Sequence, residues 1–190
     1  GMVLENVVLT DALECCWHCR NAKLRGVQAE HGDYLFMHGE NIDVDGFRLN
    51  GNYSFQYCRN VVIRNAEIHS KDAFWNTEDV TVYDSVVDGE YLGWHSRNLR
   101  LVNCRISGTQ ALCYAENLVL ENCTLGEDAD LCFEYSSVHA EIKGRVHSVK
   151  NPRSGRIVAE EYGDIILDEH CKAPANCSIE TGKKQSGEAA

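Results

Sequence analysis

The stretch NIDVDGFRL (residues 41–49) returns along the chain as NVVIRNAEI (60–68), DVTVYDSVV (79–87), NLRLVNCRI (98–106) and NLVLENCTL (117–125). Each version begins nineteen residues after the one before it, and weaker copies begin at Asn6 and Asn21. A fixed internal period near twenty residues is typical of a solenoid, in which each repeat forms one coil.

Within each repeat, apolar residues such as Val61 and Ile63 alternate with polar ones. This alternation and the β-branched residues favour strands over helices. The leucine pattern of a leucine-rich repeat is absent, and nineteen is not a multiple of six, which excludes a hexapeptide helix. At about 3.3 Å per residue, nineteen residues give a coil about 60 Å around, enough for two or three short strands. Parallel crossovers are right-handed, so we predict an all-β fold, a single-stranded right-handed parallel β-helix.

Asparagine and aspartate recur at the start of each repeat, and a second set follows at Gly46, Asn65, Asp84, Asn103 and Asn122. These residues tolerate the left-handed backbone region and hydrogen-bond to nearby backbone. We therefore expect them at the corners of the coil, stacked in ladders along its axis. A third corner is expected at Gly51, Gly89 and Gly108.

Length and charge indicate the broad class of protein. The 190 residues favour one domain, predicted over residues 1–180, with a polar tail over 181–190. The net charge of −11 argues against nucleic acid and anionic membranes as partners. No apolar run is long enough to span a membrane and no leader is visible, so a cytoplasmic location is expected.

Ten cysteines are many for this length, and without a secretion signal they are expected to be reduced thiols. Several share columns nineteen apart, as small residues packed inside a coil would. Cys15, Cys16, His18 and Cys19 form one cluster of metal-ligand types. A zinc site usually combines two such clusters, so rung packing is favoured, no metal or cofactor is predicted, and metal binding remains an alternative.

The second half of each repeat carries most of the aromatic and polar side chains. Interpreted as a second strand, it places Trp75 and Trp94 in one column and His95 and Tyr114 in the next. Both parities carry bulky groups, so alternation does not decide which column faces water. Aromatic rings with carboxylates and amides along a sheet are typical of grooves that bind sugars. The candidate ligand-binding residues are Lys71, Asp72, Glu90, Tyr91, Trp94, His95, Gln110, Tyr114 and Glu134.

After Leu125 the period slips, and eight extra residues fall near HSVKNPRSG (147–155). Insertions in solenoids often bind ligands. This stretch is also the most basic spot on an acidic chain, which adds Lys150 and Asn151 to the candidates. A plain connecting loop is the alternative, because Asn-Pro and Ser-Gly are turn signals.

Five segments carry a resemblance: SKDAFWN (70–76), GEYLGWHS (89–96), QALCY (110–114), FEYS (133–136) and SVKNPRSG (148–155). They resemble the signature segments of a bacterial family of right-handed, pectin-lyase-like β-helix proteins of unknown function. The match runs from about residue 32 to 168 and supports the fold. It implies no activity, and the acidic and basic motifs of polygalacturonases and pectate lyases are missing here.

Three functions remain open from the sequence. The first is binding, or processing, of a carbohydrate along the second-strand face. Asp72 and Glu90 lie one rung apart and could approach the separation of about 5–5.5 Å found in retaining glycosidases, but a Lys71–Glu90 ion pair explains Glu90 more simply. The second is a non-enzymatic scaffold that binds a partner or another copy, and the third is metal binding at Cys15–Cys19. Whether the chain is an enzyme stays open.

Two structural predictions follow from the register. Trp75 and Trp94 should stack on adjacent rungs, with Trp17 farther along the same column. The N-terminal end offers only residues 2–13 before its first full coil. Open solenoid ends expose apolar interior and unpaired strand groups, so we expect a homodimer that joins two first rungs.

Overall fold

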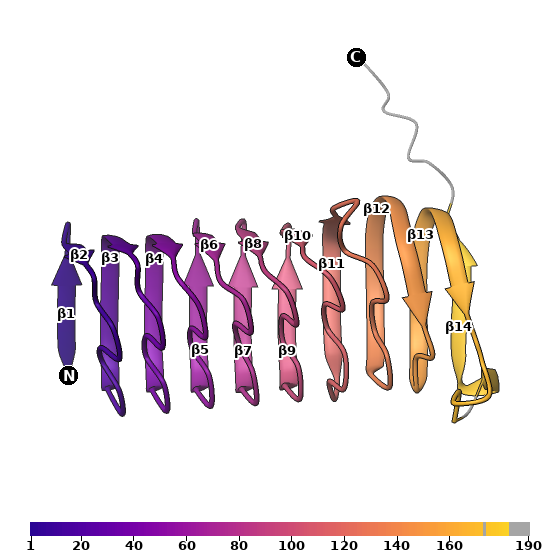
Figure 1. The fold of residues 1–190 in the computed structure, drawn as a ribbon, viewed down its shortest axis with the longest axis horizontal. Coiled ribbons are helices and arrows are strands. Elements are labelled where there is room, and N and C mark those ends of the chain that lie inside the picture. The colour runs from indigo at the N-terminus through magenta and orange to yellow at the C-terminus, as the bar shows by residue number, and fades with distance from the viewer. Residues whose placement is uncertain (173, 183–190) are drawn as a thin grey trace, which may run out of the picture.

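The computed structural model describes residues 1–172 and 174–182, and within them the chain forms a parallel β-solenoid. Successive rungs lie side by side from β1 at one end to β14 at the other (Figure 1). The ladders pair Ile42 with Val61, Val61 with Val80 and Val80 with Leu99, which confirms the nineteen-residue register. Each rung begins with a long strand, bends, and continues as a short strand on the next side of the coil.

Within the described residues, fourteen strands belong to one sheet. The strands are β1 (Met2–Glu5), β2 (Val8–Thr10), β3 (Arg20–Glu30), β4 (Glu40–Asn50), β5 (Arg59–Arg64), β6 (Glu67–His69), β7 (Glu78–Tyr83), β8 (Val86–Asp88), β9 (Arg97–Val102), β10 (Arg105–Ser107), β11 (Leu118–Leu125), β12 (Ser137–Lys150), β13 (Ser154–Ile166) and β14 (Cys177–Thr181). A 3₁₀ turn, η1 (Pro174–Asn176), precedes β14. Thr181 is thus part of the sheet, and residues 183–190 of the expected tail lie outside the described residues.

The corner asparagines adopt the expected conformation and form the expected ladders. Asn60 and Asn98 have φ of 51° and 55°. The Asn60 amide donates to Asn41 Oδ1 at 2.7 Å, and the Asn98 amide donates to Asp79 Oδ1 at 2.8 Å. Gly108 marks the third corner with a φ of +103°, and a Cβ there would collide with the carbonyl oxygen of Gly89. The corners therefore fix how closely consecutive rungs approach.

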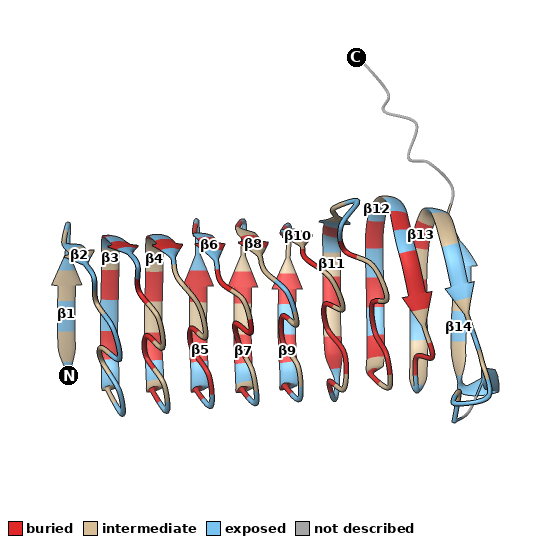
Figure 2. Cartoon of the chain, viewed as in Figure 1, coloured by how far each residue is buried: buried red, intermediate tan, exposed pale blue. Residues whose placement is uncertain are grey.

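The core is a continuous apolar column inside the coil, shown as the buried stripes of Figure 2. Val61, Ile63 and their equivalents point inward from the long strands, as the alternation predicts. Phe36, Phe55 and Phe74 face them from the opposite side and are fully buried. Phe36 and Phe55 stack with ring centroids 5.0 Å apart. Burial of each such side chain contributes about 1.5–3 kcal/mol to the free energy of folding. The buried phenylalanines therefore hold the side of the rung that carries them, its third side, against the core.

That third side is not the second strand that the sequence suggested. It is a turn segment, defined here as residues 11–19, 31–39, 51–58, 70–77, 89–96, 108–117 and 126–136 on successive rungs. Alternate residues within it have positive φ, as in Tyr53, Phe55 and Tyr57. Their amides donate alternately to the next and the previous rung, for example Tyr53 to Lys71 and Phe55 to Leu35. A strand alternates faces because its residues share one conformation, and here they do not.

The prediction of an insertion at residues 147–155 is wrong. His147 to Lys150 lie within β12, and Ser154 already begins β13. The ladder pairs Val138 with Gly155, only seventeen residues on, and then Gly155 with Cys177, twenty-two residues on. The extra residues therefore fall between Ile166 and Cys177, where η1 lies.

Candidate functional site

The turn segments present three outward-facing columns of side chains. The first contains Tyr34, Tyr53, Asp72 and Tyr91, the second Met37, Gln56, Trp75 and Trp94, and the third His38, Tyr57, Asn76 and His95. The residues between the first two columns, such as Leu35 and Phe36, are buried. Both parities expose bulky groups because the alternating positive φ values send two consecutive side chains inward and the next two outward.

Trp75 and Trp94 stack as predicted, with ring centroids 5.3 Å apart and an interplanar angle of 29°. Trp94 Nε1 donates to the carbonyl oxygen of Gln110 at 2.6 Å. Trp17, nearer the N-terminus, makes the equivalent bond to the Tyr34 carbonyl at 2.6 Å. The shared geometry supports the placement of Trp17 in the same column.

A shallow depression of about 510 Å³ lies over the rungs that carry these tryptophans. Its walls are aromatic, and its polar groups come from Gln56, Lys71 and Asp72. Of the predicted site residues, the structure therefore brings Lys71, Asp72, Tyr91 and Trp94 together. The sequence-based candidates missed some of its lining, although the nineteen-residue columns contained the signal: Tyr34, Tyr53, Gln56, Tyr57 and Trp75.

Charge at this depression is concentrated on three neighbouring groups. Lys71 Nζ lies 3.6 Å from Glu90 Oε2, which confirms the ion pair, and 5.4 Å from the ring centroid of Tyr91. Asp72 is largely buried, and this burial raises the pKa of its carboxyl group, although the charge of Lys71 opposes the rise. Asp72 is thus a carboxyl group held in an apolar setting, able to bond a hydroxyl group.

The remaining predicted residues lie farther along the coil. His95 and Tyr114 stack at 5.1 Å in the third column. Glu134 is buried and pairs with Lys150 Nζ at 3.1 Å, which raises the pKa of the Lys150 ammonium group. Asn151 is fully buried, and its amide donates to Asp168 Oδ1 at 2.8 Å. Asn151 therefore holds the chain after β12 rather than facing a ligand.

Glu134 does not lie in the column that strict counting by nineteen gives, which would align it with Ala115 and Ser96. Phe133 N donates to the Ala111 carbonyl, as Leu112 N does to that of Leu92, so Phe133 follows Leu112 in the buried column. Glu134 accordingly continues the column of Trp75 and Trp94. Two extra residues in the turn segment 126–136 cause this shift, which strict counting by nineteen could not detect.

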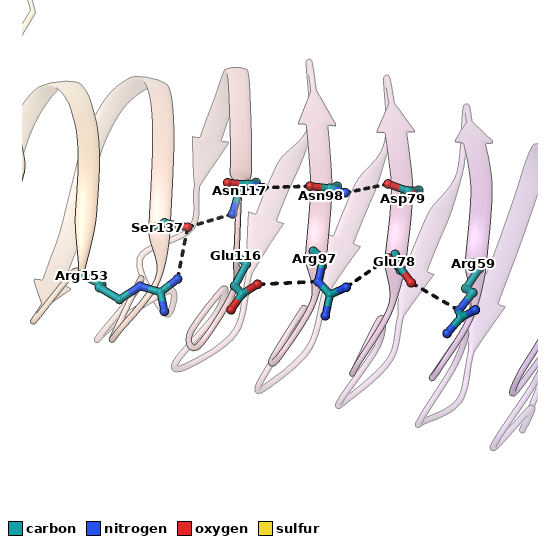
Figure 3. A network of polar contacts seen from close by, with 9 residues as sticks. All are labelled: Arg59, Glu78, Asp79, Arg97, Asn98, Glu116, Asn117, Ser137 and Arg153. Atoms are coloured by element: carbon teal, nitrogen blue, oxygen red, sulfur yellow. Dashed lines mark hydrogen bonds and ion pairs between the residues drawn. The ribbon is translucent and has the colours of Figure 1, made fainter.

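A ladder of alternating charge runs beside the third column, at the beginning of the long strands. Glu78 lies 3.4 Å from Arg59 Nε and 3.2 Å from Arg97 Nη1, and Arg97 Nε lies 3.6 Å from Glu116 (Figure 3). Arg20 and Glu40 extend it toward the N-terminus at 3.5 Å. Alternation avoids stacking like charges on neighbouring strands, which would be destabilising.

In the cysteine cluster, two thiols lie side by side and the histidine stacks on the next rung. Cys15 Sγ and Cys16 Sγ are 3.5 Å apart, and His18 stacks on His38 at 5.0 Å. Burial raises the pKa of the Cys16 thiol, which opposes the thiolate that a metal needs. Among the residues that the structure describes, no three His, Cys, Asp or Glu side chains are grouped to hold a metal ion.

Comparison with known proteins places the chain in a family. Residues 1–180 match the family described as "Protein of unknown function (DUF3737)". The chain belongs to this family. No curated protein and no solved structure matches it. The described part of this DUF3737 protein contains no helix long and apolar enough to cross a membrane.

Proposed function

We propose that this protein binds a carbohydrate in the aromatic depression of its turn segments. One observation carries the proposal: six aromatic side chains from four neighbouring rungs surround one depression whose polar groups are Gln56, Lys71 and Asp72. Sugar rings pack their apolar faces on aromatic rings, and their hydroxyl groups need hydrogen-bond partners. The resemblance to pectin-lyase-like β-helix proteins concerns the fold alone, so the choice of ligand rests on the depression.

The first column offers a place for one sugar ring. Tyr34 and Tyr53 stack with centroids 4.5 Å apart, and Asp72 interrupts the column before Tyr91. Tyr53 and Tyr91 are two rungs apart, which is about 9.6 Å at a strand spacing of about 4.8 Å. A ring bound over Asp72 would contact both tyrosines, and the carboxyl group below it would bond a hydroxyl group.

We propose binding and no chemical step. A glycosidase of the two-carboxylate type needs an acid and a second free carboxylate on the two sides of the scissile bond. Asp72 has the raised pKa expected of an acid, but the ion pair with Lys71 already engages Glu90. The geometry therefore favours a lectin-like site.

The experiment compares two tryptophans that make the same hydrogen bond. Neutral and acidic oligosaccharides are screened on a glycan array, and the affinity of each ligand found is measured by calorimetry. We expect Trp94→Ala to weaken binding by at least about tenfold, or about 1.4 kcal/mol, because a stacking surface is lost. Trp17→Ala should leave the affinity unchanged, since Trp17 lies outside the depression.

Asp72→Asn provides a second variant if Trp94→Ala does not fold. It keeps the shape of the side chain and changes only its charge and hydrogen-bonding groups. An array on which no glycan binds, or equal weakening by Trp94→Ala and Trp17→Ala, would overturn the proposal.

A further inference from the structure

The third column is an exposed stack of rings with one member missing. His18 and His38 stack at 5.0 Å with an interplanar angle of 5°, and His38 and Tyr57 stack at 4.9 Å and 19°. The stack resumes with His95 and Tyr114 at 5.1 Å and 20°. Between Tyr57 and His95 the column holds Asn76, whose side chain is shorter than a ring. Two rung spacings of about 4.8 Å leave a gap there for one planar ring.

The gap opens into a groove of about 470 Å³, whose lining shares Tyr57 with the depression proposed for carbohydrate. One wall is the third column, and the other is the charge ladder at Arg59, Glu78 and Arg97 (Figure 3). Glu78 pairs with both arginines, so each guanidinium group of this wall already has a carboxylate partner. Recognition of a ligand in this groove therefore falls to the stacked rings and to Asn76.

Each of the two rings that border the gap stacks on another ring on its far side. His38 supports Tyr57, and Tyr114 supports His95, which also contacts Trp75 at 5.3 Å. Because these side chains are already ordered, the site loses less conformational entropy when a ligand binds. A ring that enters the gap would extend a stack that already has the required spacing on both sides.

The floor of the gap selects the ligand further. The Asn76 side chain is exposed and makes no hydrogen bond with any residue that the structure describes, unlike the laddered asparagines at the corners. Its amide presents a donor beside an acceptor. An asparagine amide recognises in this way the edge of a heteroaromatic ring that carries an acceptor beside a donor, as on adenine.

We propose that the Asn76 gap binds a planar heteroaromatic ring with adjacent donor and acceptor groups, the chemistry of a nucleobase in a free nucleoside. The ring stacks between Tyr57 and His95, and its polar edge pairs with the Asn76 amide. The net charge of −11 disfavours a polynucleotide, so the ligand is a small molecule. This site goes beyond the carbohydrate site and lies on the other side of Trp75.

The test titrates adenosine and cytidine into the full chain, with binding measured by saturation-transfer NMR and calorimetry. N6,N6-dimethyladenosine, which lacks the donor, is the probe control. We expect saturable binding of adenosine or cytidine, and at least about tenfold weaker binding of the dimethylated nucleoside than of adenosine. Asn76→Tyr should abolish binding because its own ring fills the gap, and the Tm should not fall.

Two further variants separate the sites and guard against misfolding. Asn76→Asp keeps the backbone preference for positive φ but removes the amide donor, and it should weaken binding by about tenfold. Asp72→Asn, in the carbohydrate depression, should leave nucleoside affinity unchanged. No saturable binding of either nucleoside up to about 10 mM, where a Kd of about 1 mM would already be saturated, overturns the proposal. Nucleoside binding that persists unchanged in both Asn76 variants also overturns it.

Discussion

At the residue scale, the corner column shows how one side-chain type stabilises consecutive rungs. Each amide donates to the rung before it: Asn41 to Asn21 at 3.0 Å, Asn60 to Asn41 at 2.7 Å and Asn117 to Asn98 at 3.2 Å. Asp79 accepts from Asn98 at 2.8 Å, but an ionised carboxylate has no proton to donate onward. Asparagine thus continues a ladder that aspartate can only end.

The ladder predicts that Asn98→Asp is more destabilising than Asn117→Asp. Asn98→Asp removes a bond to a charged acceptor and places two carboxylates together, which should cost about 2 kcal/mol of unfolding free energy. Asn117→Asp ends the column against a neutral amide and should cost about 1 kcal/mol. Both residues have positive φ, which aspartate tolerates as asparagine does. Urea unfolding measures the difference, and equal losses would contradict the ladder.

At the scale of the elements, the beginnings of the long strands carry the ladder of alternating charge. Glu78 on β7 contacts arginines on both neighbouring strands, whereas among the described residues Glu116 pairs with Arg97 alone. Exposed ion pairs contribute about 0–1 kcal/mol each, so the ladder adds little net stability. Its larger effect is on register, because a slip by one rung would place arginine against arginine.

We therefore expect Glu78→Gln to be more destabilising than Glu116→Gln, by about 0.5–1 kcal/mol at low salt. The difference arises because Glu78→Gln leaves Arg59 and Arg97 without their shared partner. High salt should remove most of it, since the Debye length falls to about 3 Å at 1 M. Urea titrations at both ionic strengths measure it, and a difference that survives 1 M salt would indicate a packing effect instead.

At the scale of the whole molecule, the two ends of the coil differ from its middle. Figure 2 shows the buried stripes fading at β1 and β14. In the described chain β1 and β2 pair only with β3, so one side of each strand is open. Val3 and Val8 are 62% and 61% exposed there. We propose that two copies join first rung to first rung, which would cover these apolar groups.

Sedimentation velocity at micromolar concentration tests this association, and we expect a dimer. Val8→Lys should yield a monomer, because a charge on an edge strand blocks pairing. Ile165→Lys, at an exposed apolar position toward the opposite end, should leave the dimer intact. A monomeric parent chain, or equal loss of the dimer in both variants, would contradict pairing at the first rung.

The solenoid, its period, the corner residues and the inward columns could all be predicted from the amino-acid order. This was possible because in-register rungs repeat one environment every nineteen residues, so each column reports its own surroundings. The third side of the coil could not be predicted in this way, because its conformation depends on the neighbouring rungs. Residues such as Tyr53 and Phe55 rarely adopt positive φ, and amides bonded to both neighbouring rungs hold them there. No local pattern encodes that conformation.

The same cause explains what the sequence showed of the site. Lys71, Asp72, Tyr91 and Trp94 were correctly grouped because they share neighbouring rungs. The exposed columns could not be chosen, since they depend on which residues adopt positive φ. Asn151 is buried in a hydrogen bond with Asp168, and two extra residues in the turn segment 126–136 shift the column of Glu134. A repeat fixes which residues align, but the backbone path between repeats decides which of them face water.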